Sequence, residues 1–303
     1  MHAIHDARRT AASLPWDALA DEIEALLRAG AARVPPRIVM PTGDGSVLFV
    51  MPATDGTVAM TKLISFTAAN AGAGRPTIQG EVSVFDVASG ERRLILDGPT
   101  VTARRTAAVS ALAARHLAAC PQGPALIVGA GVQGRAHLQA CAATLGVRRF
   151  VIASRSAASA QALVQHAHSL GLQAESVADA HAALARCPLV VTCTPANAVV
   201  LRGPVRADAF VAAVGAFTPQ MRELDAGLCR HFAEHGRIVV DTRDAEHEAG
   251  DLLQAGIAVA PLPSLQDVLR GPQPPRGGPV LFKSCGWAGW DLAAARLALR
   301  QGA

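Results

Sequence analysis

Three glycines spaced as Gly-x-Gly-x-x-Gly stand between an apolar run and a segment rich in alanine and leucine. The apolar run is Ala125–Val128, and the glycines are Gly129, Gly131 and Gly134. In a strand–turn–helix unit, the first glycine allows a tight turn, the second lets the backbone approach a pyrophosphate, and the third lets helix and strand pack closely. The N–H groups at the start of the next helix then bind the phosphates. The sequence therefore predicts a dinucleotide site.

The end of the next strand indicates which nicotinamide cofactor binds. An acidic residue there would accept a hydrogen bond from the ribose 2′-OH of NAD, whereas an arginine suits the 2′-phosphate of NADP. Here the expected strand Arg149–Ala153 is followed by Ser154, Arg155 and Ser156, with no acid at the tip. The guanidinium can pair with a phosphate, and both hydroxyls can donate to it. We predict that NADPH is preferred; NADH is the alternative if Arg155 is only a solvated loop residue.

Lysine is rare in this chain. Of its 28 lysine and arginine residues, only Lys62 and Lys283 are lysines. An ammonium group can lose its proton, which a guanidinium in a protein does not do. The two lysines are therefore candidates for proton transfer, with chance retention of so few residues as the alternative.

Composition and charge argue against several classes of protein. The 303 residues suffice for two domains, and no apolar run reaches membrane-spanning length, so we expect no membrane partner. The net charge of +4 comes without clustered arginines or an aromatic platform, which predicts no nucleic-acid partner. The six cysteines and ten histidines lack metal-ligand spacing, so we expect no metal and free thiols. The N-terminal residues lack a signal pattern, which predicts a cytoplasmic location.

Hydrophobic patterning predicts an α/β chain. After an amphipathic helix over residues 16–28, short strand-like runs separated by turn residues fill residues 35–101. A helix that starts near Thr106 leads into alternating strands and helices, the pattern of a Rossmann-type doubly wound parallel sheet. We expect a last helix over residues 291–300 with Asp291 as its cap. The strands expected in the parallel sheet are 125–128, 150–153, 189–192, 210–214, 238–241, 257–260 and 280–284.

Residues 101–108, followed by the glycine motif, resemble the ornithine cyclodeaminase/μ-crystallin family. The resemblance implies a Rossmann NAD(P)-binding domain over residues 106–286. It also implies an N-terminal α+β domain, residues 1–105 with 287–303, that binds substrate and forms a homodimer. Known members include ornithine cyclodeaminases, some alanine dehydrogenases and reductases of cyclic ketimines. Further stretches that keep the family order are 34–37, 51–53, 61–65, 80–86, 213–219, 222–224 and 282–286.

The resemblance also assigns roles to individual residues. Arg37, Lys62 and Arg105 match the positions that hold the substrate carboxylate, and their charges suit that task. Lys62 is also our candidate for protonating the substrate nitrogen, with a bound water as its rival. The positions expected to bind the cofactor are Thr77, Arg105, Thr106, Gly129, Gly131, Val132, Gln133, Gly134, Ser154, Arg155, Ser156, Thr194, Val214 and Ser284.

Two departures from the cyclodeaminases indicate the reaction. This chain has Phe217 where they carry an aspartate, and Phe49 where they carry a glutamate. Without both carboxylates a diamino acid's ammonium would be unpaired, whereas a cyclic imine offers a carboxylate and a flat apolar ring. We therefore expect NAD(P)H-dependent reduction of Δ1-pyrroline-2-carboxylate and Δ1-piperideine-2-carboxylate to L-proline and L-pipecolate. The alternatives are an ornithine cyclodeaminase or alanine-type dehydrogenase and, in another class, an NADPH-dependent small-molecule binding protein.

Overall fold

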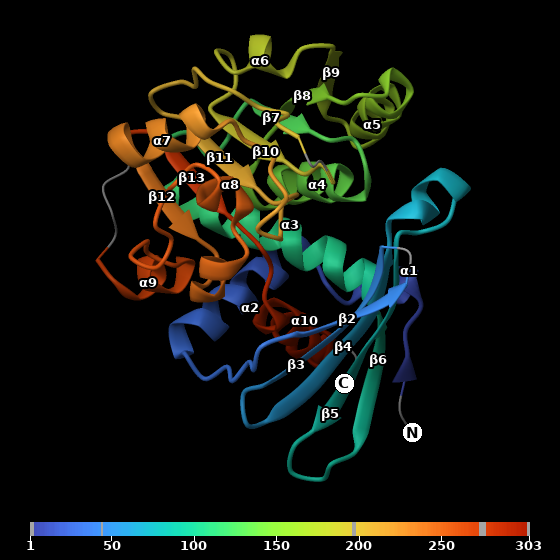
Figure 1. Cartoon of the computed structure of the whole chain (residues 1–303). Helices are drawn as coiled ribbons and strands as arrows, with labels where there is room; N and C mark the ends of the chain where they lie inside the picture. The colour runs from blue at the N-terminus through green and yellow to red at the C-terminus, as the bar shows by residue number, and fades with distance from the viewer. Residues whose placement is uncertain (1–2, 44, 196–197, 273–276, 302–303) are drawn as a thin grey trace. The chain divides into compact units, whose positions relative to one another are not determined.

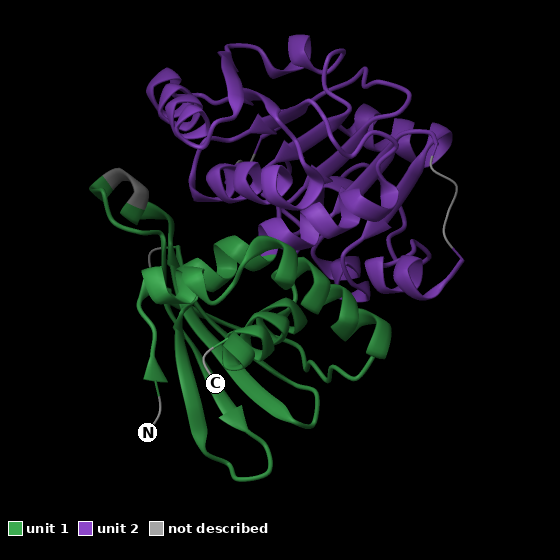
Figure 2. Ribbon diagram, turned by 180° about the vertical axis from the view of Figure 1, so that it is seen from behind, with its two compact units in different colours: residues 1–105, 287–303 green, residues 106–286 purple. Residues whose placement is uncertain are grey.

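The computed structural model describes residues 3–43, 45–195, 198–272 and 277–301 (Figure 1). The chain divides into two compact units, which Figure 2 colours separately. Unit 1 comprises Met1–Arg105 with Trp287–Ala303, and unit 2 comprises Thr106–Gly286. Among the described residues, no helix is both long and apolar enough to cross a membrane.

Unit 1 contains a six-stranded sheet with the strand order β1-β6-β5-β4-β3-β2. Strand β1 pairs with β6 in parallel, and the other neighbours are antiparallel, as the turn-separated runs predicted. Helix α10 packs against β3, β4, β5 and β6, and α2 packs against α10. The elements are β1 (Ala3–Ile4), α1 (Ala7–Ala12), α2 (Trp16–Ala29), β2 (Ile38–Gly43), β3 (Ser46–Thr54), β4 (Val58–Thr67), the 3₁₀ helix η1 (Ala68–Ala73), β5 (Ile78–Asp86), β6 (Arg92–Asp97) and α10 (Ala288–Gln301).

Unit 2 contains a seven-stranded parallel sheet with the order β12-β13-β11-β10-β7-β8-β9. Its strands β7, β10, β11 and β13 are buried at every residue, which explains their continuous apolar sequences. The Rossmann-type α/β fold is therefore confirmed. The elements are β7 (Ala125–Val128), α4 (Val132–Leu145), β8 (Arg149–Ala153), α5 (Ala157–Ser169), β9 (Gln173–Val177), α6 (Ala180–Ala183), β10 (Leu189–Thr192), β11 (Phe210–Ala213), α7 (Ala226–His235), β12 (Arg237–Val240), the 3₁₀ helix η2 (Arg243–His247), α8 (Gly250–Leu253), α9 (Leu265–Arg270) and β13 (Val280–Lys283).

The chain passes from unit 1 into unit 2 within helix α3 (Gly98–Leu117), which begins earlier than expected. We predicted a start near Thr106, with the strand-like region extending to Val101. The β-branched Val101 and Thr102 do favour an extended backbone. Asp97 instead starts the helix, since its Oδ1 accepts the N–H of Thr100 at 2.8 Å. Arg105 consequently lies inside a helix rather than at its start.

Two further expectations about elements were wrong, and one strand was missed. Residues 257–260 do not form a strand, because the N–H of Ile257 turns back to bond the Leu252 carbonyl. Strand β9 was not predicted, since its edge position leaves polar residues exposed and weakens the apolar signal. Helix α10 begins at Ala288, so Asp291 lies in its first turn and is not its cap.

Candidate active site

Lys62 is buried in unit 1 and forms an ion pair with Asp291. Its Nζ lies 2.7 Å from Asp291 Oδ2, and both residues are fully buried. The other carboxylate oxygen, Oδ1, lies 3.3 Å from Nε of Arg105, which is 7% exposed. A buried carboxylate thus lies between two cationic groups, and the three side chains form one cluster of net positive charge. We call these three residues the Lys62 cluster.

The β-sheet and helix α10 together explain why these side chains meet. Lys62 on β4 pairs with Met51 on β3 and Val82 on β5, and all three are buried. Because directly opposite residues project from the same face, Lys62 lies on the core face of the sheet. Asp291 comes from the first turn of α10, the helix packed against these strands. The sequence does not mark Asp291 as a site residue, because an aspartate at the start of the last helix is also typical of a helix cap.

The surroundings of Lys62 make its ammonium group able to lose a proton near neutral pH. Burial lowers the pKa of Lys62 to about 8, and the positive charges of Arg105 and Arg37 act in the same direction. The Asp291 carboxylate opposes them and raises the pKa. A pKa close to the working pH is what general acid–base catalysis requires. The Lys62 cluster can therefore attract a carboxylate and exchange a proton.

Two other residues expected at the substrate also belong to unit 1. Phe49 on β3 pairs with Ile64 and is half-buried. Since alternate residues share a face, Phe49 lies on the same face of the sheet as Met51 and Lys62. Arg37 is half-buried directly before β2, and its charge acts on Lys62. Four expected substrate residues therefore come from one unit, while Phe217 is half-buried in unit 2.

The glycine motif of unit 2 has the geometry that a dinucleotide requires. Gly129 has a φ of +116°, and a Cβ on Gly134 would lie 1.9 Å from the Gly129 carbonyl oxygen. A Cβ on Gly131 would meet no atom within 4 Å, so this glycine borders open space. Gly131 precedes α4 without a side-chain cap, and Val132 in its first turn is 72% exposed. The N–H groups at this helix start are thus placed to hold a pyrophosphate.

The tip of β8 carries the residues expected to select the cofactor. Arg155 and Ser156 are exposed and Ser154 is half-buried. The Ser156 Oγ accepts the N–H of Ser159 at 3.1 Å and so caps α5, while Ser154 Oγ accepts the N–H of Ser156 at 3.4 Å. Both hydroxyls still have their hydrogens to donate, and an exposed guanidinium can pair with a phosphate.

The remaining cofactor candidates differ in the hydrogen bonds that their polar groups already make. Thr194 donates its N–H and Oγ1–H to Glu223, and Ser284 Oγ lies 2.8 Å from Asp241 Oδ2 as its donor. These hydroxyls can therefore offer a ligand only lone pairs. Thr106 is buried in unit 2, and Thr77 is half-buried in unit 1. Gln133 accepts a hydrogen bond at its carbonyl from His137, 2.8 Å away. Val214 follows β11 and donates its N–H to the Thr192 carbonyl at 2.9 Å.

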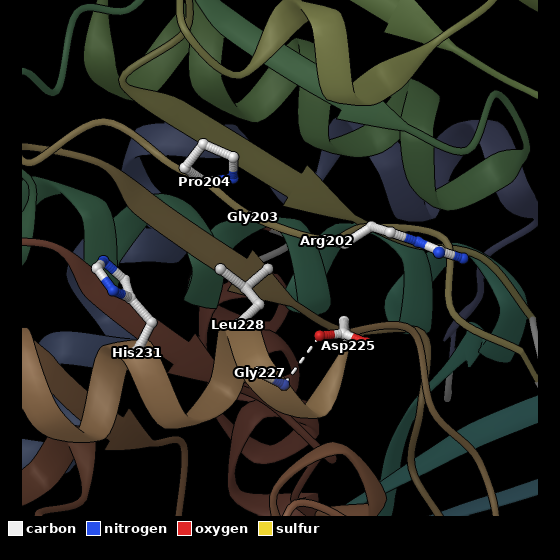
Figure 3. Close-up of a pocket in the computed structure, with 7 residues that line it drawn as sticks. All are labelled: Arg202, Gly203, Pro204, Asp225, Gly227, Leu228 and His231. Carbon is white, nitrogen blue, oxygen red and sulfur yellow. Dashed lines mark hydrogen bonds between the residues drawn. The ribbon is translucent and has the colours of Figure 1, made fainter.

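A pocket of about 290 Å³ in unit 2 lies outside these candidates. Figure 3 shows Arg202 and His231 at opposite ends of it, and the Asp225 carboxylate accepts the N–H of Gly227 at 2.8 Å. None of the predicted site residues lines this pocket. In the part of the chain that the structure describes, no group of three or more metal-ligating side chains occurs either. The lining residues are Arg202, Gly203, Pro204, Asp225, Gly227, Leu228 and His231.

The fold and site define an α/β protein with a Rossmann-type parallel sheet in one unit and a buried cluster of lysine, aspartate and arginine in the other. Comparison with protein families assigns it more narrowly. The model of the ornithine cyclodeaminase/mu-crystallin family matches residues 2–301, and the chain belongs to this family. The resemblance stated from the sequence is thereby confirmed.

Several relatives are similar over nearly the whole chain. A Delta(1)-pyrroline-2-carboxylate reductase 2 of Burkholderia ambifaria is 40% identical, covering 97% of this chain and 94% of the relative. A Delta(1)-pyrroline-2-carboxylate/Delta(1)-piperideine-2-carboxylate reductase of Azospirillum brasilense is 39% identical with the same coverage. The solved structure of Thermococcus litoralis Delta(1)-pyrroline-2-carboxylate reductase, in complex with NADH and L-proline, shares the fold. Its TM-score is 0.91 at 23% identity, with 99% of this chain and 97% of that chain covered.

Proposed function

We propose that this protein is an NAD(P)H-dependent reductase of cyclic ketimines. Its substrates are Δ1-pyrroline-2-carboxylate and Δ1-piperideine-2-carboxylate, and its products are L-proline and L-pipecolate. The observation that carries the proposal is the Lys62 cluster, a buried lysine with a pKa of about 8 beside Arg105 and Asp291. The two relatives at 40% and 39% identity carry the names of such reductases, which supports the substrate class.

The chain's own residues divide the reaction between binding and proton transfer. Reduction of the C=N bond adds a hydride to carbon and a proton to nitrogen, and bound NAD(P)H would supply the hydride. The guanidinium groups of Arg37 and Arg105 hold the substrate carboxylate, which orients the imine carbon. The Lys62 ammonium group donates the proton to the ring nitrogen. Asp291 then holds the neutral lysine amine in place. Phe49 on the same sheet face offers an apolar surface to the ring.

The assay that tests this proposal measures NADPH oxidation with each cyclic imine. Ammonia release from L-ornithine with NAD is measured beside it. Rapid NADPH oxidation without ammonia release is the expected result. Ammonia release without imine reduction would instead make the protein a cyclodeaminase, and turnover in neither assay would contradict the proposal.

We further propose that NADPH is preferred to NADH because of Arg155. For the change Arg155→Asp, we expect kcat/KM with NADPH to fall by about 100-fold, since a phosphate loses its charged partner and meets a carboxylate. The value with NADH should stay the same or rise. Steady-state rates with both cofactors give the ratio. Arg149→Asp makes the same charge change at the other end of β8, where the side chain is also exposed, and should leave the ratio unaltered.

We also propose that the protein is a homodimer formed through the sheet of unit 1. Ile38 is 59% exposed and Leu63 is 41% exposed, and both lie on the face opposite to Lys62 because both are in register with Val50. Met40, also exposed, is on the same face. Contiguous exposed apolar residues of this kind mark protein interfaces.

The change Leu63→Asp should convert the dimer into a monomer, because it places a charge within this apolar face. Light scattering coupled to size-exclusion chromatography measures the mass directly. Leu170→Asp is the matched control, since Leu170 is a 46% exposed leucine of unit 2. A dimer that persists in Leu63→Asp would place the interface elsewhere.

A further inference from the structure

A second buried lysine lies in unit 2, where the reaction just described does not use it. Lys283 ends β13 and is fully buried, with its Nζ 2.8 Å from Asp251 Oδ2. The same ammonium group donates to the carbonyl of Ala216 at 2.5 Å and to that of Ala213 at 3.4 Å. Ala213 is the last residue of β11, and Ala216 lies in the loop that follows it. A buried charge is costly unless its partners are fixed, so this ammonium group fixes the loop in turn.

Lys283 keeps its proton, whereas Lys62 can lose its proton near neutral pH. Burial alone would lower the pKa of Lys283, but the carboxylate of Asp251, together with Cys285 and Glu223, raises it above its ordinary value. Lys62 instead has two arginines beside its one carboxylate. Lys283 therefore remains an ammonium group across the physiological range and serves as a fixed cation rather than a proton donor.

Asp251 of this ion pair also bonds to Glu223, a second buried acidic residue. Asp251 Oδ1 accepts the N–H groups of Glu223 at 2.6 Å and Leu224 at 2.8 Å. The Glu223 side chain accepts the N–H of Thr194 at 2.6 Å and the N–H of Gly215 at 2.6 Å. It also accepts the hydroxyls of Thr192 at 3.1 Å and of Thr194 at 2.9 Å. One carboxylate thus joins the end of β10 to the loop after β11.

Gly215 shows how closely these two loops approach each other. A Cβ at this position would lie 2.0 Å from the Thr194 carbonyl oxygen and 2.5 Å from Glu223 Cδ. The loop 214–217 is therefore held at Gly215 by Glu223 and at Ala216 by Lys283. The next residue along the chain is Phe217, which stands where cyclodeaminases carry an acid.

Both loops lie at the edge of the sheet where a ligand is expected. The chain forms β7, β8 and β9 in that order and then places β10 on the other side of β7. The strand order therefore reverses between β7 and β10, and parallel sheets bind ligands beyond the carboxyl ends of the strands at such a reversal. Gly129 follows β7, and Cys193 and Thr194 follow β10.

We infer that Lys283, Asp251 and Glu223 form a positioning network that holds Thr194 and the loop 214–217 in place for the cofactor bound at this edge of the sheet. The inference rests on the proposed function and adds residues that act through the loops, without touching substrate or cofactor. Fixed groups of this kind matter because a displacement of about 1 Å at a reacting group costs roughly 100-fold in rate.

Glu223→Gln tests the network, since the amide nitrogen would face an N–H donor of Thr194 or Gly215 and displace a loop. We expect kcat to fall by about 10- to 100-fold and the dissociation constant of NADPH to rise by about tenfold. The pH at which the reduction rate declines should not move, because the Lys62 cluster is intact. The matched control is Asp267→Asn, a carboxylate of unit 2 that bonds to Ser264 and Arg243. It should lower Tm without altering either constant.

A second variant covers the case in which Glu223→Gln does not fold. The double change Lys283→Met with Asp251→Asn removes both charges of this ion pair together, so that neither is left buried without the other. It still loses the hold on Ala216, and kcat should fall by about tenfold or more. Folded variants with wild-type kcat and NADPH affinity would overturn the inference. NADPH binding, measured by fluorescence titration, tests the network even if no imine is reduced. Failure of the proposed function can therefore be distinguished from failure of the network.

Discussion

We expect kcat for imine reduction to fall by about a thousandfold when Lys62 is replaced by methionine, because proton transfer by a positioned side chain contributes about 10²- to 10⁴-fold. Methionine is unbranched and fills the space of the lysine stem, so the fold should persist. Asp291 would keep Arg105 as its cationic partner. Single-turnover rates with NADPH and Δ1-piperideine-2-carboxylate measure the effect.

The variant Lys62→Arg separates attraction of the substrate carboxylate from proton transfer to the ring nitrogen. It keeps a positive charge for the carboxylate, but a guanidinium does not release its proton at the pH of the assay. The KM for the imine should therefore rise less than in Lys62→Met, while kcat stays low. If Lys62→Met keeps most of its wild-type kcat, then a bound water supplies the proton, and the role given to Lys62 is wrong.

Replacement of Asp291 by asparagine should shift the pH dependence of the reaction. In the wild-type protein the reduction rate should decline as pH rises through about 8, because the Lys62 ammonium group loses its proton there. The oxidation of L-proline should rise over the same range, because it needs the neutral amine. Without the carboxylate that raises the pKa of Lys62, the decline should move roughly one to three pH units lower. At pH 8 the reduction rate should then fall at least about fivefold.

The control for this variant is another ion pair of the same helix. Arg296 of α10 bonds to Asp55 at 2.8 Å, so Asp55→Asn removes the carboxylate partner of an α10 residue outside the Lys62 cluster. It should lower Tm and leave the pH profile unchanged. If Asp291→Asn lowers Tm in the same way and the decline stays near pH 8, Asp291 is only a structural partner.

Local sequence signals were sufficient for most of the parallel sheet and for the glycine motif. Strand β10 was predicted with its observed bounds, since a strand buried on both faces has a continuous apolar sequence. The roles of Gly129 and Gly134 follow from backbone geometry within a few residues, which a short motif can encode. The start of α3 was missed because one hydrogen bond from Asp97 outweighed the β-branched residues that follow it.

The partners of the buried charges were decided only by the tertiary structure. The rarity of lysine in the sequence singled out Lys62 and Lys283, and both are fully buried. Asp291 lies 229 residues from Lys62 along the chain, so no local pattern could pair them. Whether a buried lysine becomes a labile acid or a fixed cation depends on the charges that folding places around it. Two arginines surround Lys62 and two carboxylates surround Lys283, and this arrangement is determined only when the strands and helices pack.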